Sequence, residues 1–167
     1  GTIGIYANNT LNTTINGGNI TSKNGGIALY SGDNSTINLS GSNILTAQQG
    51  GLLFYNYMNG TGVVTGKYNI NSPASVNVNA GGLLLYAKVS SLSDISSVAS
   101  AIKGSFSNVG NLTVNMAAGS NVMYIDSPGG TASINSFAGL PSLTSSFFNF
   151  VGTGYNDYVM NGFNLTL

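Results

Sequence analysis

Four aspartates are the only side chains of this chain suited to acid–base chemistry or to binding a hard metal ion. The sequence adds four lysines and has no Arg, Glu, His or Cys. A hydrolase that acts on polysaccharides needs paired carboxylates at about 5–10 Å. Asp33 lies far from the others along the chain, so we expect no pair that includes it, whereas Asp126 and Asp157 could meet. Turn-forming or solvated aspartates are the better explanation of all four, and we expect no enzyme.

Composition excludes several other kinds of site. Without His or Cys the chain has no usual catalytic triad and no zinc site. The Gly-Gly-x-Gly-x-Asp pattern of calcium-binding repeats is absent, so we expect no cofactor and no metal. Only 5% of residues are charged, which argues against nucleic acid, because clustered Lys and Arg hold it. No uncharged apolar run approaches the ~20 residues that span a bilayer, so we expect no membrane insertion of this segment.

A glycine-led apolar motif that ends in tyrosine recurs five times and is the strongest pattern in the chain. Successive tyrosines lie 24, 25, 31 and 38 residues apart. A strand-length motif at such intervals indicates a solenoid, because one repeat cannot bury its own apolar face but stacked repeats can. The copies are Gly1–Tyr6, Gly25–Tyr30, Gly50–Tyr55, Gly81–Tyr86 and the weaker Gly119–Tyr124.

Shorter segments after each motif supply the remaining strands. Those expected second in each repeat alternate apolar and polar residues, and they are 11–16, 35–40, 75–79, 111–116 and 132–135. Those expected third are 19–21, 43–45 and 68–70. Three short strands per repeat, with Gly, Asn and Asp at the corners, predict an all-β fold: a right-handed parallel β-helix of about five to six coils.

Stacked repeats should align equivalent residues in columns along the axis. Alternation predicts an inward column of Ile3, Ile27, Leu52 and Leu83, which Asn121 interrupts. It predicts a second inward column of Ile5, Leu29, Phe54, Leu85 and Met123. It also places an intervening column outside with the tyrosines, and that column would need a cover. Its members are Gly4, Ala28, Leu53, Leu84 and Val122.

Three insertions interrupt what we expect to be a single β-helix fragment over residues 1–167. A Gly-rich, hairpin-like loop is expected at 56–67. Residues 87–108 carry apolar residues at three- and four-residue spacing, which predicts an amphipathic helix that could cover Leu53 and Leu84. The third insertion, 136–151, is rich in Phe and Leu and has no regular pattern. Loops on a repeat scaffold commonly carry function, so the insertions are candidate contact regions.

Two groups of aromatic side chains are candidate contact surfaces. The tyrosine column is expected to stabilise neighbouring repeats by stacking, as cross-strand aromatic pairs do. The alternative is a platform for a sugar ring or a partner protein. The second group lies outside the column, and it either covers the core or contacts a partner. Its members are Phe147, Phe148, Phe150, Tyr155 and Tyr158.

The repeat style resembles the passenger domains of type Va autotransporter adhesins. The resemblance is carried by Gly-Gly-Ile-Ala-Leu-Tyr (25–30) followed by Asn-Ser-Thr-Ile-Asn-Leu-Ser-Gly (34–41), and it covers nearly the whole chain outside the insertions. The chain is most similar to the large fusobacterial outer-membrane adhesins, which share its Asn/Gly-rich, Arg-poor style. The resemblance implies a β-helical stalk, exported to the cell surface and anchored to the outer membrane through a barrel outside this fragment. It brings no set of binding residues.

We therefore expect a segment of a bacterial surface adhesin, a rigid stalk that presents loops to a host-cell or bacterial surface protein or glycan. Self-association through Asn/Thr ladders is a variant of this expectation. A surface polysaccharide hydrolase or lyase on the same scaffold is an alternative, and it would depend on Asp126 and Asp157. A pure spacer segment with no binding of its own is the other alternative.

Overall fold

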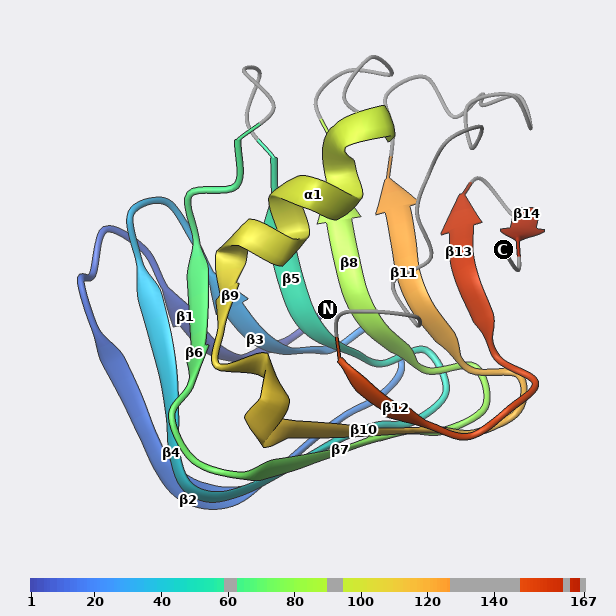
Figure 1. The fold of residues 1–167 in the computed structure, drawn as a ribbon, viewed down its shortest axis with the longest axis horizontal. Helices are drawn as coiled ribbons and strands as arrows, with labels where there is room; N and C mark the ends of the chain where they lie inside the picture. Colours follow the sequence, from blue (N-terminus) through green and yellow to red (C-terminus); the bar gives the residue numbers. More distant parts are fainter. Residues whose placement is uncertain (59–62, 90–94, 127–147, 161–162, 166–167) are drawn as a thin grey trace.

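Two β-sheets make up most of the protein (Figure 1), and the chain is mostly β, as predicted. The computed structural model describes residues 1–58, 63–89, 95–126, 148–160 and 163–165. The tyrosine sheet, named for its repeated tyrosines, consists in order of β1 (Ile3–Ala7), β3 (Ile27–Ser31), β5 (Leu52–Tyr57), β8 (Leu83–Lys88), β11 (Asn121–Asp126), β13 (Asn156–Met160) and β14 (Phe163–Leu165). The second sheet consists of β2 (Thr13–Ser22), β4 (Thr36–Ala47), β6 (Lys67–Ile70), β7 (Ala74–Val78), β9 (Phe106–Ser107), β10 (Leu112–Met116) and β12 (Asn149–Val151). One α-helix, α1 (Ile95–Ser105), and a 3₁₀ turn, η2 (Val109–Asn111), complete the described elements.

The tyrosine sheet stacks the repeated motif in register. Strands β1, β3, β5, β8, β11 and β13 pair in parallel, and only β14 is antiparallel to its neighbour. The pairing aligns the tyrosines of β1, β3, β5, β8 and β11 with one another, and Val159 of β13 continues the row. The sequence prediction that equivalent residues align in columns is confirmed for these strands.

The second sheet contains two long strands, β2 and β4, that bend and pair in two halves. The first half of β4 pairs with β6, so that Leu39 lies opposite Ile70. Its second half pairs with β7, so that Leu45 lies opposite Val76. Figure 1 shows the sharp bend of β2 and β4 between the two halves. Segment 68–70 is therefore the second strand of its repeat and 75–79 the third. Segment 111–116, predicted as a second strand, is also a third one, because β10 pairs with β7 and follows β9. The predicted order is wrong for these segments, since the alternation of 75–79 resembles that of 35–40.

In the described residues, every connection from the second sheet to the next strand of the tyrosine sheet is a four-residue turn. The turns are 23–26, 48–51, 79–82, 117–120 and 152–155. Their third residue is always glycine, with φ between 74° and 83°, a left-handed conformation that other residues adopt only with strain. The amides of the first four of these glycines each donate to the carbonyl of the counterpart in the next turn, over 2.6–2.9 Å. The connections in the other direction, from a tyrosine strand to the second sheet, differ in length: 32–35 has four residues, 58–66 has nine and 89–105 has 17.

The tyrosine strands do not alternate strictly, and this overturns part of the predicted orientation. The column of Ala28, Leu53, Leu84 and Val122, expected outside, is at most 1% exposed. The preceding residues, such as Leu52 and Leu83, were expected inside but are only half-buried and line a groove with the tyrosines. The register joins the first and third positions of these strands and skips the second. Second and third side chains consequently both face the interior, and no outward leucine column needs a cover.

Helix α1 contributes to the same interior. Val98 and Ile102 are buried in one cluster with Leu53 and Leu84, so the helix packs on the core and does not cover the outer face. Figure 1 shows α1 running from the end of β8 towards β9. The predicted helix in 87–108 is thus present with shorter bounds, and Gly104 falls in its last turn. In the insertion at 56–67, an antiparallel bridge between Met58 and Val64 fits the expected hairpin.

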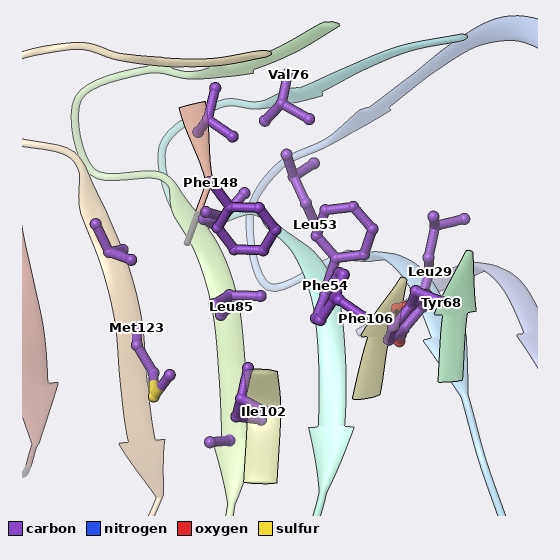
Figure 2. Packing of buried hydrophobic residues seen from close by; sticks show 14 of the residues in the cluster. Leu29, Leu53, Phe54, Tyr68, Val76, Leu85, Ile102, Phe106, Met123 and Phe148 are labelled. Carbon is purple, nitrogen blue, oxygen red and sulfur yellow. Dashed lines mark hydrogen bonds between the residues drawn. The ribbon is translucent and has the colours of Figure 1, made fainter. Parts of the chain in front are cut away.

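A chain of aromatic rings fills the centre of the core. Phe54, Tyr68 and Phe106 contact one another with ring centroids 5.0–5.2 Å apart, and Phe148 joins them through Phe106 at 5.2 Å. Figure 2 shows these rings in the interior, with Leu29, Leu53 and Leu85 around them. The aromatic cluster ties both sheets and the end of the α1 connection into one core.

Candidate functional site

The five repeated tyrosines form one continuous stack on the outer face of the tyrosine sheet. Successive ring centroids lie 4.7, 4.3, 5.0 and 5.5 Å apart from Tyr6 to Tyr124, which are favourable separations for aromatic pairs. The rings are half-buried, apart from Tyr6 at the sheet edge. Three of the four pairs are stacked and the Tyr30–Tyr55 pair is tilted by 57°, so neighbouring tyrosines occupy most of the ring faces. The geometry supports the stacking role and disfavours a flat sugar platform.

A small polar cluster lies where β8 and β11 end. The Tyr86 hydroxyl donates a hydrogen bond to Oδ2 of Asp126, and Lys88 Nζ lies 3.3 Å from the same oxygen. Burial, followed by the hydrogen bond and the charge of Asp126, raises the pKa of Tyr86 above its usual range. Tyr86 therefore remains protonated and cannot serve as a base near neutral pH. Lys88 and Asp126 are partly exposed, and an ion pair of this kind contributes at most about 1 kcal/mol.

The carboxylates of Asp126 and Asp157 do not have the separation of a hydrolytic pair. The register of β11 and β13 places Asn156 opposite Asn121 and Tyr158 opposite Met123, so Asp157 lies beside Val122. Asp126 is four residues further along its strand, or roughly 13 Å. Asp157 is buried, whereas Asp33 is exposed and accepts a hydrogen bond from Thr65 Oγ1 over 2.9 Å. Among the described residues no three His, Cys, Asp or Glu side chains group as a metal site.

The carboxyl ends of three adjacent tyrosine strands carry the long connections. Strands β5, β8 and β11 are neighbours and end at Tyr57, Lys88 and Asp126. Tyr57 pairs with Lys88 and Lys88 with Asp126 across the sheet. Every residue inserted after these strands therefore leaves from one edge, which we name the carboxyl edge of the tyrosine sheet. The five four-residue turns lie at the opposite ends of the strands.

The predicted aromatic contact residues separate into buried and partly exposed members. Phe148 and Tyr158 belong to the core, with exposed fractions of 5% and 0%. Phe150 and Tyr155 are half-buried and stack at 6.1 Å. Phe147 and most of the 136–151 insertion lie outside the described residues. Phe148 and Tyr158 therefore have the core role, one of the two predicted for this group. Among the described members, only Phe150 and Tyr155 are exposed enough to contact a partner.

A groove of about 460 Å³ runs beside the tyrosine stack. Its floor includes the half-buried Leu52, Leu83 and Asn121, and the glycines of the four-residue turns line it as well. Sequence reasoning missed this groove because it assigned Leu52 and Leu83 to the interior. The available signal was Asn121, since a polar residue is tolerated in that column only if the column faces out. Asn121 donates to Gly82 O and accepts from Asn156 Nδ2, over 3.3 and 2.9 Å.

Comparison with protein-family models, curated proteins and solved structures gave no match. Within the described ranges, α1 is too short to cross a bilayer and no other helix could do so.

Proposed function

We propose that the chain is a segment of a right-handed parallel β-helix that forms the stalk of a bacterial surface adhesin and presents inserted loops for attachment. The observation that carries the proposal is the carboxyl edge, where the long connections all leave from adjacent strands of one regularly stacked sheet. Loops held by a rigid scaffold are a common way to build a contact surface. The resemblance to autotransporter passengers favours the same assignment.

Rigidity along the axis supports the stalk role. The tyrosine stack, the glycine-turn ladder and the core columns each run without interruption from one repeat to the next. Asparagine side chains add ladders on the second sheet: Asn38 Nδ2 donates to Asn12 and Asn69 Nδ2 donates to Asn38, over 3.1 and 2.9 Å. These four kinds of side-chain and backbone contact therefore resist bending between repeats.

The low charge of the chain shapes the kind of attachment that we propose. With four lysines and four aspartates in 167 residues, an interface would depend on apolar contacts and neutral hydrogen bonds. Such an interface is screened little by salt, because screening acts on separated charges. The proposed partners are proteins or glycans on host cells or on other bacteria, and the proposed location is the cell surface, with the outer-membrane anchor in another part of the parent protein. The separation of Asp126 from Asp157 favours this proposal over a hydrolase.

The test is binding of the labelled chain to epithelial cells and to partner bacteria, compared with a loop variant. In the variant a short Gly/Ser link replaces residues 127–147. The replacement stops there because β12 pairs with β10 and Phe148 is part of the core. A matched control shortens only residues 59–62, in the connection that follows β5 at the same edge. Both variants must first show the circular dichroism and thermal unfolding of the parent chain.

The outcomes separate the functions. Saturable binding that the 127–147 variant loses and the 59–62 variant keeps would support an adhesive loop at the carboxyl edge. Loss in both variants would support a contact spread along that edge. Absence of saturable binding by the parent chain would refute the adhesive role and leave a spacer segment.

A further inference from the structure

We infer that the groove beside the tyrosine stack binds a neutral, unbranched oligosaccharide that lies along the axis of stacking. The inference names one partner class, a glycan, and rests on the proposed function only for its biological meaning. The groove is an open channel of about 460 Å³ with a largely apolar lining. Its lining extends from Ile27 on β3 to Val159 on β13, four strand spacings or roughly 19 Å. Its long axis thus crosses the strands.

Charge selects against several occupants. The residues that line the groove are glycine, aliphatic residues, tyrosine and one asparagine, and all of them are uncharged. A sialylated glycan, an anionic lipid headgroup or a nucleic acid would leave its charge without a counter-charge on this surface. Lys23 is exposed in the turn that holds Gly25, and the Lys88–Asp126 ion pair lies at the far ends of the strands, but none of these charged residues lines the groove. A neutral ligand matches this lining.

The two sides of the groove differ in hydrogen-bonding capacity. On the glycine side, the amides of Gly25, Gly50 and Gly81 already donate from turn to turn, so an extended peptide cannot add there as a strand. On the tyrosine side, the hydroxyls of Tyr55 and Tyr124 show no hydrogen-bond partner among the described residues. Burial raises the pKa of Tyr55 to about 12, which keeps its hydroxyl a donor. Two donors over an apolar floor suit a polymer with polar rims and apolar ring faces.

A sugar chain meets these requirements better than a hydrocarbon chain. Its C–H faces can rest on Leu52 and Leu83 while its hydroxyls reach the tyrosine side and Asn121. A hydrocarbon chain would cover the tyrosine hydroxyls without pairing them, and such desolvation costs free energy. The donors of Tyr55 and Tyr124 are separated by two strand spacings, or roughly 10 Å. A ligand of three or four sugar units would span both.

The test uses the full chain and defined probes. Maltotetraose, cellotetraose and lacto-N-tetraose are titrated by NMR and calorimetry, with a sialylated trisaccharide as the charged comparison and octyl glucoside as the hydrocarbon comparison. We expect at least one neutral tetrasaccharide to shift the resonances of Leu52, Leu83 and Asn121 saturably. Tyr55→Phe or Tyr124→Phe removes one hydroxyl and keeps the ring, so each should weaken binding roughly 5- to 10-fold. Tyr6→Phe, which lies outside the groove lining, should leave affinity unchanged.

Several results would overturn the inference. No saturable shift at millimolar tetrasaccharide would do so, as would binding that Tyr55→Phe and Tyr124→Phe leave intact. Octyl glucoside that binds better than every tetrasaccharide would reassign the groove to hydrocarbon chains. Cell attachment distinguishes the two proposals: if the parent chain attaches to cells but binds no tetrasaccharide, the groove inference fails and the adhesin proposal stands. Glycan binding in the groove without cell attachment would support the groove inference and count against the adhesin proposal.

Discussion

Removal of one hydroxyl from the core, in Tyr68→Phe, should destabilise the protein by several kilocalories per mole. Tyr68 on β6 is completely buried, and its hydroxyl accepts from the Ser31 amide at 3.0 Å and donates towards Tyr55 O at 2.5 Å, with Leu29 O at 3.2 Å. The hydroxyl therefore joins the second sheet to β3 and β5 of the tyrosine sheet. The ring itself, with its contacts to Phe54 and Phe106, is retained in phenylalanine.

The magnitude follows from what the substitution leaves unpaired. A buried amide without an acceptor costs about 1–3 kcal/mol, and the lost bond to Tyr55 O adds about 1 kcal/mol. The sum is about 2–4 kcal/mol. For a domain of this size each kcal/mol lowers Tm by about 2–4 °C, so we expect a decrease of roughly 5–15 °C.

The measurement is unfolding by urea and by heat, followed by circular dichroism, for Tyr68→Phe and for Tyr6→Phe. Tyr6 is 54% exposed, and its substitution should change stability by no more than about 0.5 kcal/mol. Equal midpoints for the two variants would refute the view that the Tyr68 hydroxyl braces the two sheets.

Three further predictions concern stability. Gly66→Ala should destabilise the fold by about 2 kcal/mol or more, because the added Cβ would overlap a backbone carbonyl of β3. Gly104→Ala, which has open space around it in α1, should instead stabilise the fold by about 0.5–1 kcal/mol. Urea midpoints that shift in the same direction in both variants would contradict this prediction. Ile102→Ala should lower the free energy of unfolding by about 2–4 kcal/mol, because it leaves a cavity in the core. The control Ser100→Ala, at an exposed position of the same helix, should have a small effect. Unchanged thermal unfolding of both variants would exclude α1 from the core. Burial raises the pKa of Tyr55 to about 12 in the folded state. The contribution of Tyr55 to the free energy of unfolding is therefore complete below about pH 10 and is lost as the pH rises to about 12. Urea midpoints that stay constant between about pH 9 and 12 would refute this prediction.

Repetition made most of the architecture predictable from the sequence. The glycines before the apolar runs, three of them in Gly-Gly pairs, mark turns that need a left-handed third residue, and glycine is found there in all five turns. Tyrosine holds a constant place in the motif, which is enough to align the strands from the sequence alone, and the observed register agrees. Spacing of three and four residues identified a helix inside 87–108 for the same reason, since a change of period is visible against a regular background.

The errors have a common physical cause, because alternation describes only an uninterrupted strand. Leu53 and Phe54 are adjacent and both completely buried, which a strict period of two forbids. Nothing local distinguishes such a strand from a regular one, and the interior was therefore assigned one position too early. The groove was lost with that assignment, since Leu52 and Leu83 could not be both core residues and part of an exposed floor. Asn121 was the one residue that contradicted the alternation.

The contrast between the two kinds of connection bears on how such a chain can vary over evolution. At the four-residue turns a glycine ladder fixes both length and backbone conformation, so an inserted or deleted residue there would shift the register of every later strand. At the carboxyl edge, connections of nine and 17 residues leave the following strands in register. One side of the molecule thus preserves the scaffold while the other accepts new sequence at small cost. For protein engineering, the carboxyl edge is a permissive graft site, and foreign epitopes placed there could be displayed side by side at intervals set by the strand spacing.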